Sequence, residues 1–340
     1  MSDFRPISLC NIIAKIIGRI MTNRLKGVLV NIISETQSAF LPGCFISDNI
    51  LVSHELLHYM KHKVTSKNAF MSLKLDMSKA YDRIEWKFLE SIMLKLGFSR
   101  ILVDWTMCLV SSVSYSFLVN GAPRGFIRPT RGIRQGHLLL PYLFLLCAEG
   151  LTYMTRKAEE RKALTGVKIS KESPSISHIR FADDTMLFCK ASARESQMVI
   201  RILRDYETAS GQKINLEKCS VSFDSSASRS TRMEMLEVLG MREVEDQGKY
   251  LGLPSQIGRS KRQVYSYIVG KVEDRLRGWI WKMLSQAGKE IMIKSVTSTI
   301  PIFVMNYFKL LVGLIDNLNS SMTKFFWENA EGERGIHWKA

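Results

Sequence analysis

The stretch RFADDTMLF (residues 180–188) sets two aspartates side by side within an otherwise apolar segment. The flanking segments, SHIRFA and TMLFCK, carry the Ile, Phe, Thr and Leu residues that are typical of short strands. The pattern predicts a β-hairpin with carboxylates at its tip. Asp often stabilises tight turns by bonding nearby backbone N–H groups, so one interpretation is structural. The other is a site for a hard cation such as Mg²⁺, which prefers oxygen ligands.

A third aspartate follows another predicted strand. In residues 71–76, apolar residues alternate with polar ones, which predicts a strand that buries one face and points Asp76 to the other. If this strand lies beside the hairpin, Asp76, Asp183 and Asp184 share one site. Three clustered carboxylates repel one another, and two divalent cations would remove that penalty. Two metals about 3.5–4 Å apart clamp the attacking and leaving oxygens in polymerases.

The composition indicates the class of partner. Lys and Arg total 48 against 32 acidic residues, which gives a formal net charge of +16 and favours a polyanion such as nucleic acid. A basic membrane-surface protein is the alternative. No apolar run reaches the 18 or so residues of a membrane span, and the N-terminus lacks a signal pattern. We therefore expect no membrane partner and an intracellular protein, in the nucleus or cytoplasm.

The chain alternates predicted helices and strands, without repeats. Six scattered cysteines lack a C-x-x-C pair, so we expect buried thiols rather than disulfides or a zinc site. Periodicity predicts helices at 10–33, 46–62, 86–96, 135–160, 195–209 and 261–308, and strands at 70–76, 178–190, 214–223 and 249–254. Asn120-Gly121 predicts a further hairpin. The pattern indicates one continuous enzyme-like body with interleaved helices and strands.

Seven blocks, in this order, resemble the reverse transcriptase of LINE-type non-LTR retrotransposons, most of all the plant branch: DFRPISLCN, QSAFLPG, LKLDMSKAYDRIEW, RGIRQG, FADD, INLEKCSVSF and KYLGLP. The resemblance implies an α+β right-hand polymerase that copies an RNA template into DNA from a DNA primer, using dNTPs. It implies fingers at 1–69, a palm with an antiparallel sheet and inserted fingers elements at 70–254, a helical thumb at 255–330, and the start of a truncated connection at 331–340.

The resemblance also assigns roles to residues. Asp76 and Asp183 match the principal ligands of two Mg²⁺ ions, with Mn²⁺ as a substitute, and Asp184 is the third carboxylate. Tyr81 matches the aromatic steric gate that excludes a ribose 2′-OH, the alternative being a half-buried packing residue. Gln135 matches a residue near the incoming nucleotide, the alternative being a polar residue beside a helix.

Basic residues and a turn complete the expected site. Arg5 and Lys15 are candidates to contact the triphosphate of the nucleotide. The simpler alternative is that both are cations exposed to solvent. Leu251-Gly252 matches the turn that grips the primer, and the alternative is that these residues simply end a strand. Residues 255–300 contain nine Lys or Arg against three acids, and this excess favours either a solvated helical face or phosphate contacts. The candidate nucleic-acid contacts there are Arg275, Arg277 and Lys282.

One block departs from the family. Members usually read RQGDPLSP where this chain reads RQGHLLLP, so His137, Leu138 and Leu140 replace Asp, Pro and Ser. Asp caps a helix N-terminus and Pro suits the first turn, and we expect His137-Leu138 to supply neither, which predicts a shifted helix start and weak activity. His137 is then a drifted surface or helix-start residue rather than a metal ligand.

Three hypotheses follow. The chain is an active RNA-directed DNA polymerase, a catalytically silent RNA-binding remnant of one, or a basic structural or membrane-surface protein. We expect it to be a degenerate fragment of a larger polyprotein, without the endonuclease and other domains of the parent.

Overall fold

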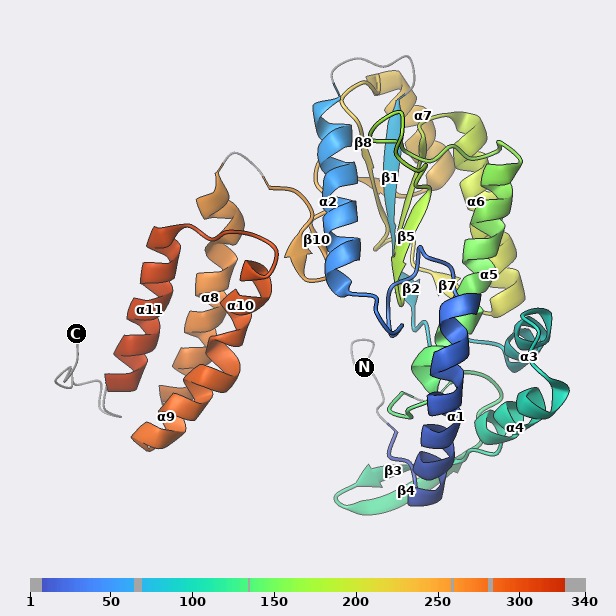
Figure 1. Cartoon of the computed structure of the whole chain (residues 1–340), viewed down its shortest axis with the longest axis horizontal. Coiled ribbons are helices and arrows are strands. Elements are labelled where there is room, and N and C mark those ends of the chain that lie inside the picture. Colours follow the sequence, from blue (N-terminus) through green and yellow to red (C-terminus); the bar gives the residue numbers. More distant parts are fainter. Residues whose placement is uncertain (1–7, 64–68, 134, 258–259, 281–283, 328–340) are drawn as a thin grey trace. The chain divides into compact units, whose positions relative to one another are not determined.

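The computed structural model describes residues 8–63, 69–133, 135–257, 260–280 and 284–327. The chain forms two compact units, with the boundary in sequence between Leu251 and Gly252. The first unit combines a sheet with helices, and the described part of the second consists mainly of helices (Figure 1). The expected α+β class is confirmed. Fingers, palm and thumb as names for parts of these units stay predictions.

The first unit is built around a central five-stranded sheet. Its helices are α1 (Ile12–Ile32), α2 (Ile46–His62), α3 (Trp86–Lys95), α4 (Arg100–Ser111), α5 (Leu140–Glu160), α6 (Ala193–Ser210) and α7 (Arg229–Leu239). Its strands are β1 (Phe70–Leu75), β2 (Met77–Ser78), β3 (Tyr115–Val119), β4 (Ala122–Ile127), β5 (His178–Phe181), β6 (Asp184–Lys190), β7 (Lys213–Ile214), β8 (Ser220–Phe223), β9 (Arg242–Glu243) and β10 (Lys249–Tyr250). The central sheet has the order β5-β6-β1-β8-β9, antiparallel except for β8 and β9.

Both faces of this sheet are covered (Figure 1). Leu73 and Leu187 belong to the larger core, which includes α5 and α6, whereas Met186 and Phe188 belong to a smaller core with α2. The predicted one-sided strand at 70–76 is therefore wrong in one respect: Ser72, on the supposedly open face, is fully buried. Its hydroxyl lies 2.8 Å from that of Ser222, so the buried oxygen is satisfied.

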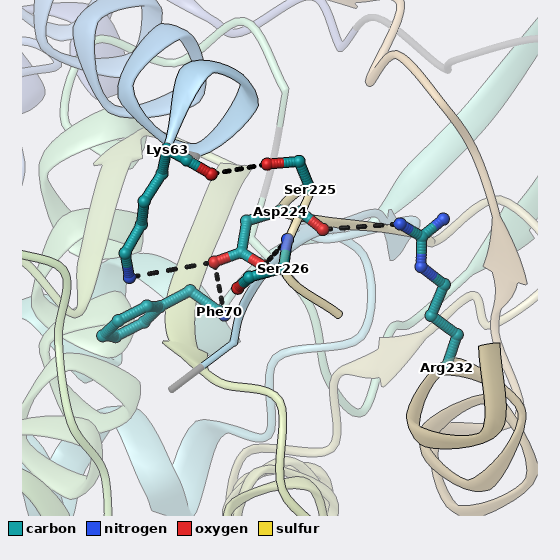
Figure 2. A network of polar contacts seen from close by, with 6 residues as sticks. All are labelled: Lys63, Phe70, Asp224, Ser225, Ser226 and Arg232. Atoms are coloured by element: carbon teal, nitrogen blue, oxygen red, sulfur yellow. Dashed lines mark hydrogen bonds and ion pairs between the residues drawn. The ribbon is translucent and has the colours of Figure 1, made fainter. Parts of the chain in front are cut away.

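A buried carboxylate joins the end of α2 to the sheet, as Figure 2 shows. Asp224 follows β8, and its side chain is fully buried. It accepts hydrogen bonds from Phe70 N–H at 2.9 Å and from the Ser226 hydroxyl at 2.7 Å. Lys63 Nζ lies 3.9 Å from the carboxylate and 4.3 Å from the centre of the Phe70 ring. Burial lowers the pKa of Lys63, and the nearby Asp224 charge opposes that shift.

Two predicted strands are wrong in part. In the segment 214–223, Ser220–Phe223 forms β8, while Ile214 belongs to the short β7, which pairs with β2. The KYLGLP segment contains two strands, β10 and β11 (Leu253–Pro254), instead of one. Leu251 and Gly252 between them have φ values of 50° and 84°. Such left-handed backbone reverses the chain, which a continuous strand cannot do.

The helices that periodicity predicts at 261–308 are confirmed in the described residues, and a further helix follows them. The elements of the second unit after β11 are α8 (Lys261–Ile280), α9 (Gln286–Met292), the π-helical turn η1 (Ile293–Thr297), α10 (Thr299–Met305) and α11 (Val312–Trp327). In neither unit is any described helix both long and apolar enough to cross a membrane. All six cysteines are free thiols. Cys147, Cys189 and Cys219 are buried as expected, but the expectation is wrong for the other three, because Cys44 and Cys108 are exposed and Cys10 is only partly buried.

The structure corrects one part of the prediction for His137, which lies beside the start of α5 as one alternative expected. His137 is 5% exposed and is not a surface residue. Its Nε2 lies 3.0 Å from the Ala14 carbonyl oxygen of α1, and its Nδ1 accepts a hydrogen bond from Leu139 N–H at 3.3 Å. The imidazole therefore does provide a partner for a backbone N–H at the helix start, contrary to expectation. The helix begins at Leu140 with Pro141 in its first turn.

Gly18 makes room for this imidazole. A Cβ atom at Gly18 would lie 2.3 Å from His137 Cε1, whereas nothing lies within 4 Å of one at Gly27 in the same helix. We expect Gly18→Ala to lower the free energy of unfolding by about 1–3 kcal/mol, the usual cost of overpacking. Gly27→Ala, the matched control, is expected to raise it by up to about 1 kcal/mol because Ala favours helix. Urea denaturation measures both, and equal effects would contradict the Gly18–His137 contact.

A second histidine is buried within β5. His178 Nε2 lies 2.9 Å from the Thr36 hydroxyl, and Nδ1 lies 3.0 Å from the Ser177 hydroxyl. Burial, reinforced by the positive charges of Arg180 and Arg156, lowers the pKa of His178 to about 3. The folded protein therefore keeps this imidazole neutral.

This burial predicts a pH dependence of stability. In the unfolded chain the pKa of His178 is about 6.5, whereas in the folded protein it is about 3. Between these two pH values the unfolded chain binds a proton that the folded protein does not. The free energy of unfolding therefore falls as the pH falls from about 6.5 toward 3, by up to about 1.4 kcal/mol per pH unit. We expect His178→Asn to be less stable than the parent at pH 7 but to lose less stability between pH 7 and 5. Chemical denaturation at both pH values measures this, with the exposed His62→Asn as control. An identical loss in His178→Asn and the parent would contradict it.

Candidate functional site

The antiparallel pairing of β1 and β6 brings the predicted catalytic residues to one end of the sheet. Leu75 pairs with Thr185, so the next residues outward, Asp76 and Asp184, are neighbours across the two strands. Asp183 precedes β6 and lies in the two-residue turn of the β5–β6 hairpin, whose last pair joins Phe181 and Asp184. By strand alternation, Asp76 and Asp184 lie on the face opposite the α5 and α6 helices.

The turn that carries Asp183 is held in an unusual backbone conformation. Ala182 has a φ of 54°, which a residue with a Cβ seldom adopts. Its N–H donates to Gln37 Oε1 at 3.0 Å, and the same oxygen accepts from Ala39 N–H at 3.1 Å. Gln37 is 1% exposed, so these bonds form away from solvent. The QSAFLPG block thus supports the FADD turn, a contact that sequence reasoning missed because the residues lie far apart in the chain.

A second contact from the same region fixes the hairpin. Asn49 of α2 donates from Nδ2 to the Arg180 carbonyl oxygen at 2.5 Å, and the Ser38 hydroxyl donates to Asn49 Oδ1 at 2.7 Å. Thr36 and Ser38 also bond the Arg180 backbone, at 2.8 and 3.3 Å. The β5–β6 hairpin is therefore bonded along its outer edge as well as to β1.

The three aspartates have the right chemistry for a hard divalent cation, because carboxylate oxygens are the ligands that Mg²⁺ prefers. Their side chains are not gathered into a ready site, however. Within the described ranges, no group of three or more His, Cys, Asp or Glu side chains is arranged to hold a metal ion. The fold supplies neighbouring backbone positions for the three carboxylates, and their assignment as metal ligands stays a prediction.

Backbone contacts fix the position of Asp76. Its N–H donates to Cys219 Sγ at 3.3 Å, and its carbonyl oxygen accepts from Asn215 N–H at 2.9 Å. Burial and the neighbouring Asp76 charge raise the pKa of the Cys219 thiol to about 11, so this thiol stays protonated at neutral pH. The INLEKC segment thus closes around the end of β1.

The KYLG turn lies near the same face. Tyr250 is buried in the small core with Met186 and Phe188 of β6. Burial and the negative charge of Asp184 raise the pKa of the Tyr250 hydroxyl. Lys74 of β1 donates from Nζ to the Lys249 carbonyl oxygen. These contacts place the residues that precede Leu251-Gly252 beside Asp184, while the primer-grip role of the turn stays a prediction.

Tyr81 contacts Ile133, two positions before Gln135 in the sequence. Ile133 N–H donates to the Tyr81 carbonyl oxygen at 2.9 Å, and the Tyr81 ring stacks on Phe144 of α5 with centroids 4.4 Å apart. Gln135 and Asp82 line a cavity of about 800 Å³ that extends to the β3–β4 hairpin. A half-buried, stacked Tyr81 is compatible with both the gate and the packing interpretation.

The β3–β4 hairpin exposes apolar side chains that the sequence reasoning did not single out. Exposed side chains on it include Phe117 and Phe126, which are 60% and 65% exposed. Three arginines accompany them in residues 114–133, namely Arg124, Arg128 and Arg131, and this segment contains no acid. The Arg128 guanidinium lies 5.5 Å from the centre of the Phe126 ring. Exposed rings beside cations are typical of surfaces that bind single-stranded nucleic acid.

The other basic residues that were expected to contact nucleotide or nucleic acid are distant in sequence from the aspartates and from the β3–β4 hairpin. Lys15 lies exposed on α1, and Arg275 and Arg277 lie exposed on α8 of the second unit. Arg277 pairs with Glu273 at 3.4 Å. Arg5 and Lys282 lie outside the described residues. The roles of all five stay predictions.

A family model and several curated proteins match this chain. The family model described as "Reverse transcriptase (RNA-dependent DNA polymerase)" matches residues 1–255. An uncharacterized mitochondrial protein of Arabidopsis thaliana is 52% identical over 69 residues, 20% of this chain and 57% of that protein. The transposon TX1 149 kDa protein of Xenopus laevis is 29% identical over 225 residues, 65% of this chain and 16% of that protein.

Two further comparisons concern a retrotransposon and a solved structure. The Pol polyprotein of the retrotransposable element R2DM of Drosophila melanogaster is 28% identical over 222 residues, 64% of this chain and 19% of that protein. Telomerase from Candida tropicalis, solved in complex with a TWJ fragment of telomeric RNA, is 11% identical with a TM-score of 0.45, over 94% of this chain and 51% of that one.

The chain spans less than a fifth of the TX1 and R2DM proteins. The family model, in contrast, extends over well more than half of this chain and includes Asp76, Asp183 and Asp184. The chain therefore belongs to the reverse transcriptase family, as a reverse transcriptase domain related to the polymerase proteins of non-LTR retrotransposons.

Proposed function

We propose that this chain is an RNA-directed DNA polymerase that adds deoxynucleotides to a DNA 3′ end. The observation that carries the proposal is the β1–β6 register, because it brings Asp76 beside Asp184 at the start of β6, next to the turn that holds Asp183. The buried bonds from Gln37 and Asn49 hold that turn in place. A rigid scaffold of this kind suits catalysis, since a misplacement of about 1 Å can cost about 100-fold in rate.

Asp76, Asp183 and Asp184 are the residues that would hold two Mg²⁺ ions, with Mn²⁺ as a substitute. Bound there, the ions would supply charge stabilisation at the attacking and leaving oxygens. The chain's own contribution is positioning. The Cys219 and Asn215 contacts hold Asp76, and the Gln37 contact holds the residue before Asp183.

The surrounding residues suit the binding of nucleotide and template. In this proposal Tyr81, braced against Phe144, excludes a ribose 2′-OH, and Gln135 contacts the nucleotide from the cavity that it lines with Asp82. The exposed rings and arginines of the β3–β4 hairpin bind the single-stranded template. Arg5, Lys15 and the basic residues of the second unit, Arg275, Arg277 and Lys282, contact phosphates, and Leu251-Gly252 contacts the primer.

The metal-binding role of Asp183 is testable. Asp183→Asn keeps the size of the side chain but removes a charge, so we expect primer extension on an RNA template with Mg²⁺ to fall at least about 100-fold while RNA affinity stays the same. Asp205→Asn, an exposed aspartate on α6, is the matched control and should retain full extension. Undiminished extension by Asp183→Asn would refute the proposed mechanism.

The role of the β3–β4 hairpin is testable by binding alone. Phe117→Ala with Phe126→Ala should weaken the binding of single-stranded RNA by at least about 30-fold, because each base stacked on an aromatic ring contributes about 1–3 kcal/mol and two rings are removed. Affinity should also fall steeply with salt, since the arginines release counterions from phosphates. Met233→Ala removes an equally exposed apolar side chain elsewhere and should bind as the parent does. Fluorescence anisotropy measures all three, and unchanged affinity of the double variant would remove the hairpin from the template path.

The second candidate is a catalytically silent RNA-binding remnant of this polymerase. The observation in its favour is the altered block, in which His137, Leu138 and Leu140 replace the usual residues close to Gln135. Primer extension by the parent chain separates the two candidates, since the remnant would bind RNA with the same salt dependence but extend nothing.

A further inference from the structure

Three histidines follow one another along α2 at intervals of four residues. His54, His58 and His62 occupy positions i, i+4 and i+8, so their side chains follow one face of the helix. The ring centroids of His54 and His58 are 6.4 Å apart, and those of His58 and His62 are 4.3 Å apart. His58 and His62 are exposed, whereas His54 is half-buried. The proposed function uses none of these imidazoles, although imidazole is a good ligand for transition metals.

The first pair matches a known metal-binding pattern in sequence but not in geometry. His54, Glu55 and His58 match the pattern H-E-x-x-H, in which two histidines on a helix bind zinc. In the structure the two rings are stacked, with their planes only 16° apart. The lone pair of an imidazole nitrogen lies in the plane of its ring, so the lone pairs of two stacked parallel rings do not converge on one point. We therefore do not assign a metal to this pair.

The second pair has a more suitable geometry. The rings of His58 and His62 are inclined at 45°, with their centroids 4.3 Å apart. A metal ion bonded to one nitrogen of each ring at about 2.0–2.1 Å, with the two bonds at a right angle, brings the ring centres to about 4.5 Å. Right-angled bonds are typical of the tetragonal sites of Ni²⁺ and Cu²⁺, whereas tetrahedral zinc would separate the ring centres by more than about 5 Å. The pair therefore suits Ni²⁺ and Cu²⁺ better than Zn²⁺.

The surroundings of this pair leave room for water ligands. The three histidines line a cavity of about 560 Å³ together with Glu55, Tyr59, Lys63 and Ile169. Lys63 would repel a cation, but its ammonium group lies 3.9 Å from the Asp224 carboxylate, as Figure 2 shows. Within the described ranges no group of three or more His, Cys, Asp or Glu side chains is arranged around one metal position. A metal on this pair would therefore take its remaining ligands from water.

We propose that His58 and His62 form a site for a late first-row transition-metal ion, best suited to Ni²⁺ or Cu²⁺. The inference goes beyond the proposed function and does not depend on it. The two sites differ in chemistry, because imidazoles suit these metals while carboxylates suit Mg²⁺. Metal bound to the pair links two successive turns of α2, the helix whose Asn49 bonds the FADD hairpin. A metal that binds the folded chain more tightly than the unfolded chain also stabilises the fold.

Isothermal titration calorimetry with Ni²⁺, in excess Mg²⁺ to occupy carboxylates, tests the site without catalysis. Ni²⁺ that the parent binds and His58→Asn does not defines the site, because metal held by the exposed thiols of Cys44 and Cys108 is common to both. We expect His62→Asn to weaken this binding at least about 10-fold, since even the loss of a residue that supports a ligand costs about 10- to 100-fold. His54→Asn is the matched control and should stay within about threefold of the parent. Zn²⁺ should bind the parent more weakly than Ni²⁺.

A variant that keeps the number of histidines tests whether their position matters. His58→Asn with Ile291→His moves one imidazole to a position on α9 that is 64% exposed, and it should lose the site as His58→Asn does. Ni²⁺ should raise the melting temperature of the parent but not of either variant. Equal Ni²⁺ binding by the parent and His58→Asn, or full binding by the relocated variant, would overturn the proposal. A loss in His54→Asn as large as that in His62→Asn would also overturn it, since the metal would then not be held by the second pair. Urea denaturation with a chelator checks that every variant is folded.

Discussion

The pairing of β1 with β6 is the constraint on which the rest of the structure depends. It runs from Phe70 with Lys190 to Leu75 with Thr185, and a shift by one residue would turn every side chain of one strand to the opposite face. Leu73 and Leu187 would then leave the larger core, and Asp76 would turn away from Asp184. The hydrophobic burial that fixes the register therefore also fixes the relative positions of the aspartates.

Buried hydrogen bonds, in addition to the strand register, fix the position of the turn that carries Asp183. A turn residue with a φ of 54° is held by a glutamine oxygen from a loop 145 residues earlier in the chain. Breaking such a bond would leave a buried N–H without a partner, at a cost of about 1–3 kcal/mol. The same region bonds the Arg180 backbone through Thr36, Ser38 and Asn49. The geometry of the aspartates thus relies on the segment that precedes and begins α2 as much as on the sheet itself.

The sequence predicted the elements that local patterns determine. Alternation predicted β1, Asn120-Gly121 predicted the β3–β4 hairpin, and the flanks of FADD predicted β5 and β6. It failed where distant residues decide the outcome. Ser72 is buried because Ser222 and Gln247, more than 100 residues away, cover it. The KYLGLP segment reverses at Leu251, although leucine seldom adopts a positive φ. The role of Gln37 depends on the tertiary position of a turn, which no local pattern encodes.

His137 shows why a departure from a family pattern does not by itself measure damage. If only the neighbouring residues of the sequence are considered, the change from Asp to His removes a helix cap, and a loosely held helix start is expected. In the fold, the imidazole satisfies Leu139 N–H and also contacts the Ala14 carbonyl oxygen of α1, a segment more than 100 residues earlier. The absence of a side chain at Gly18 gives it the space to do so. A larger residue at position 137 has thus replaced a local cap by a contact between two helices, so the segment that contains Gln135 is anchored by different means rather than released.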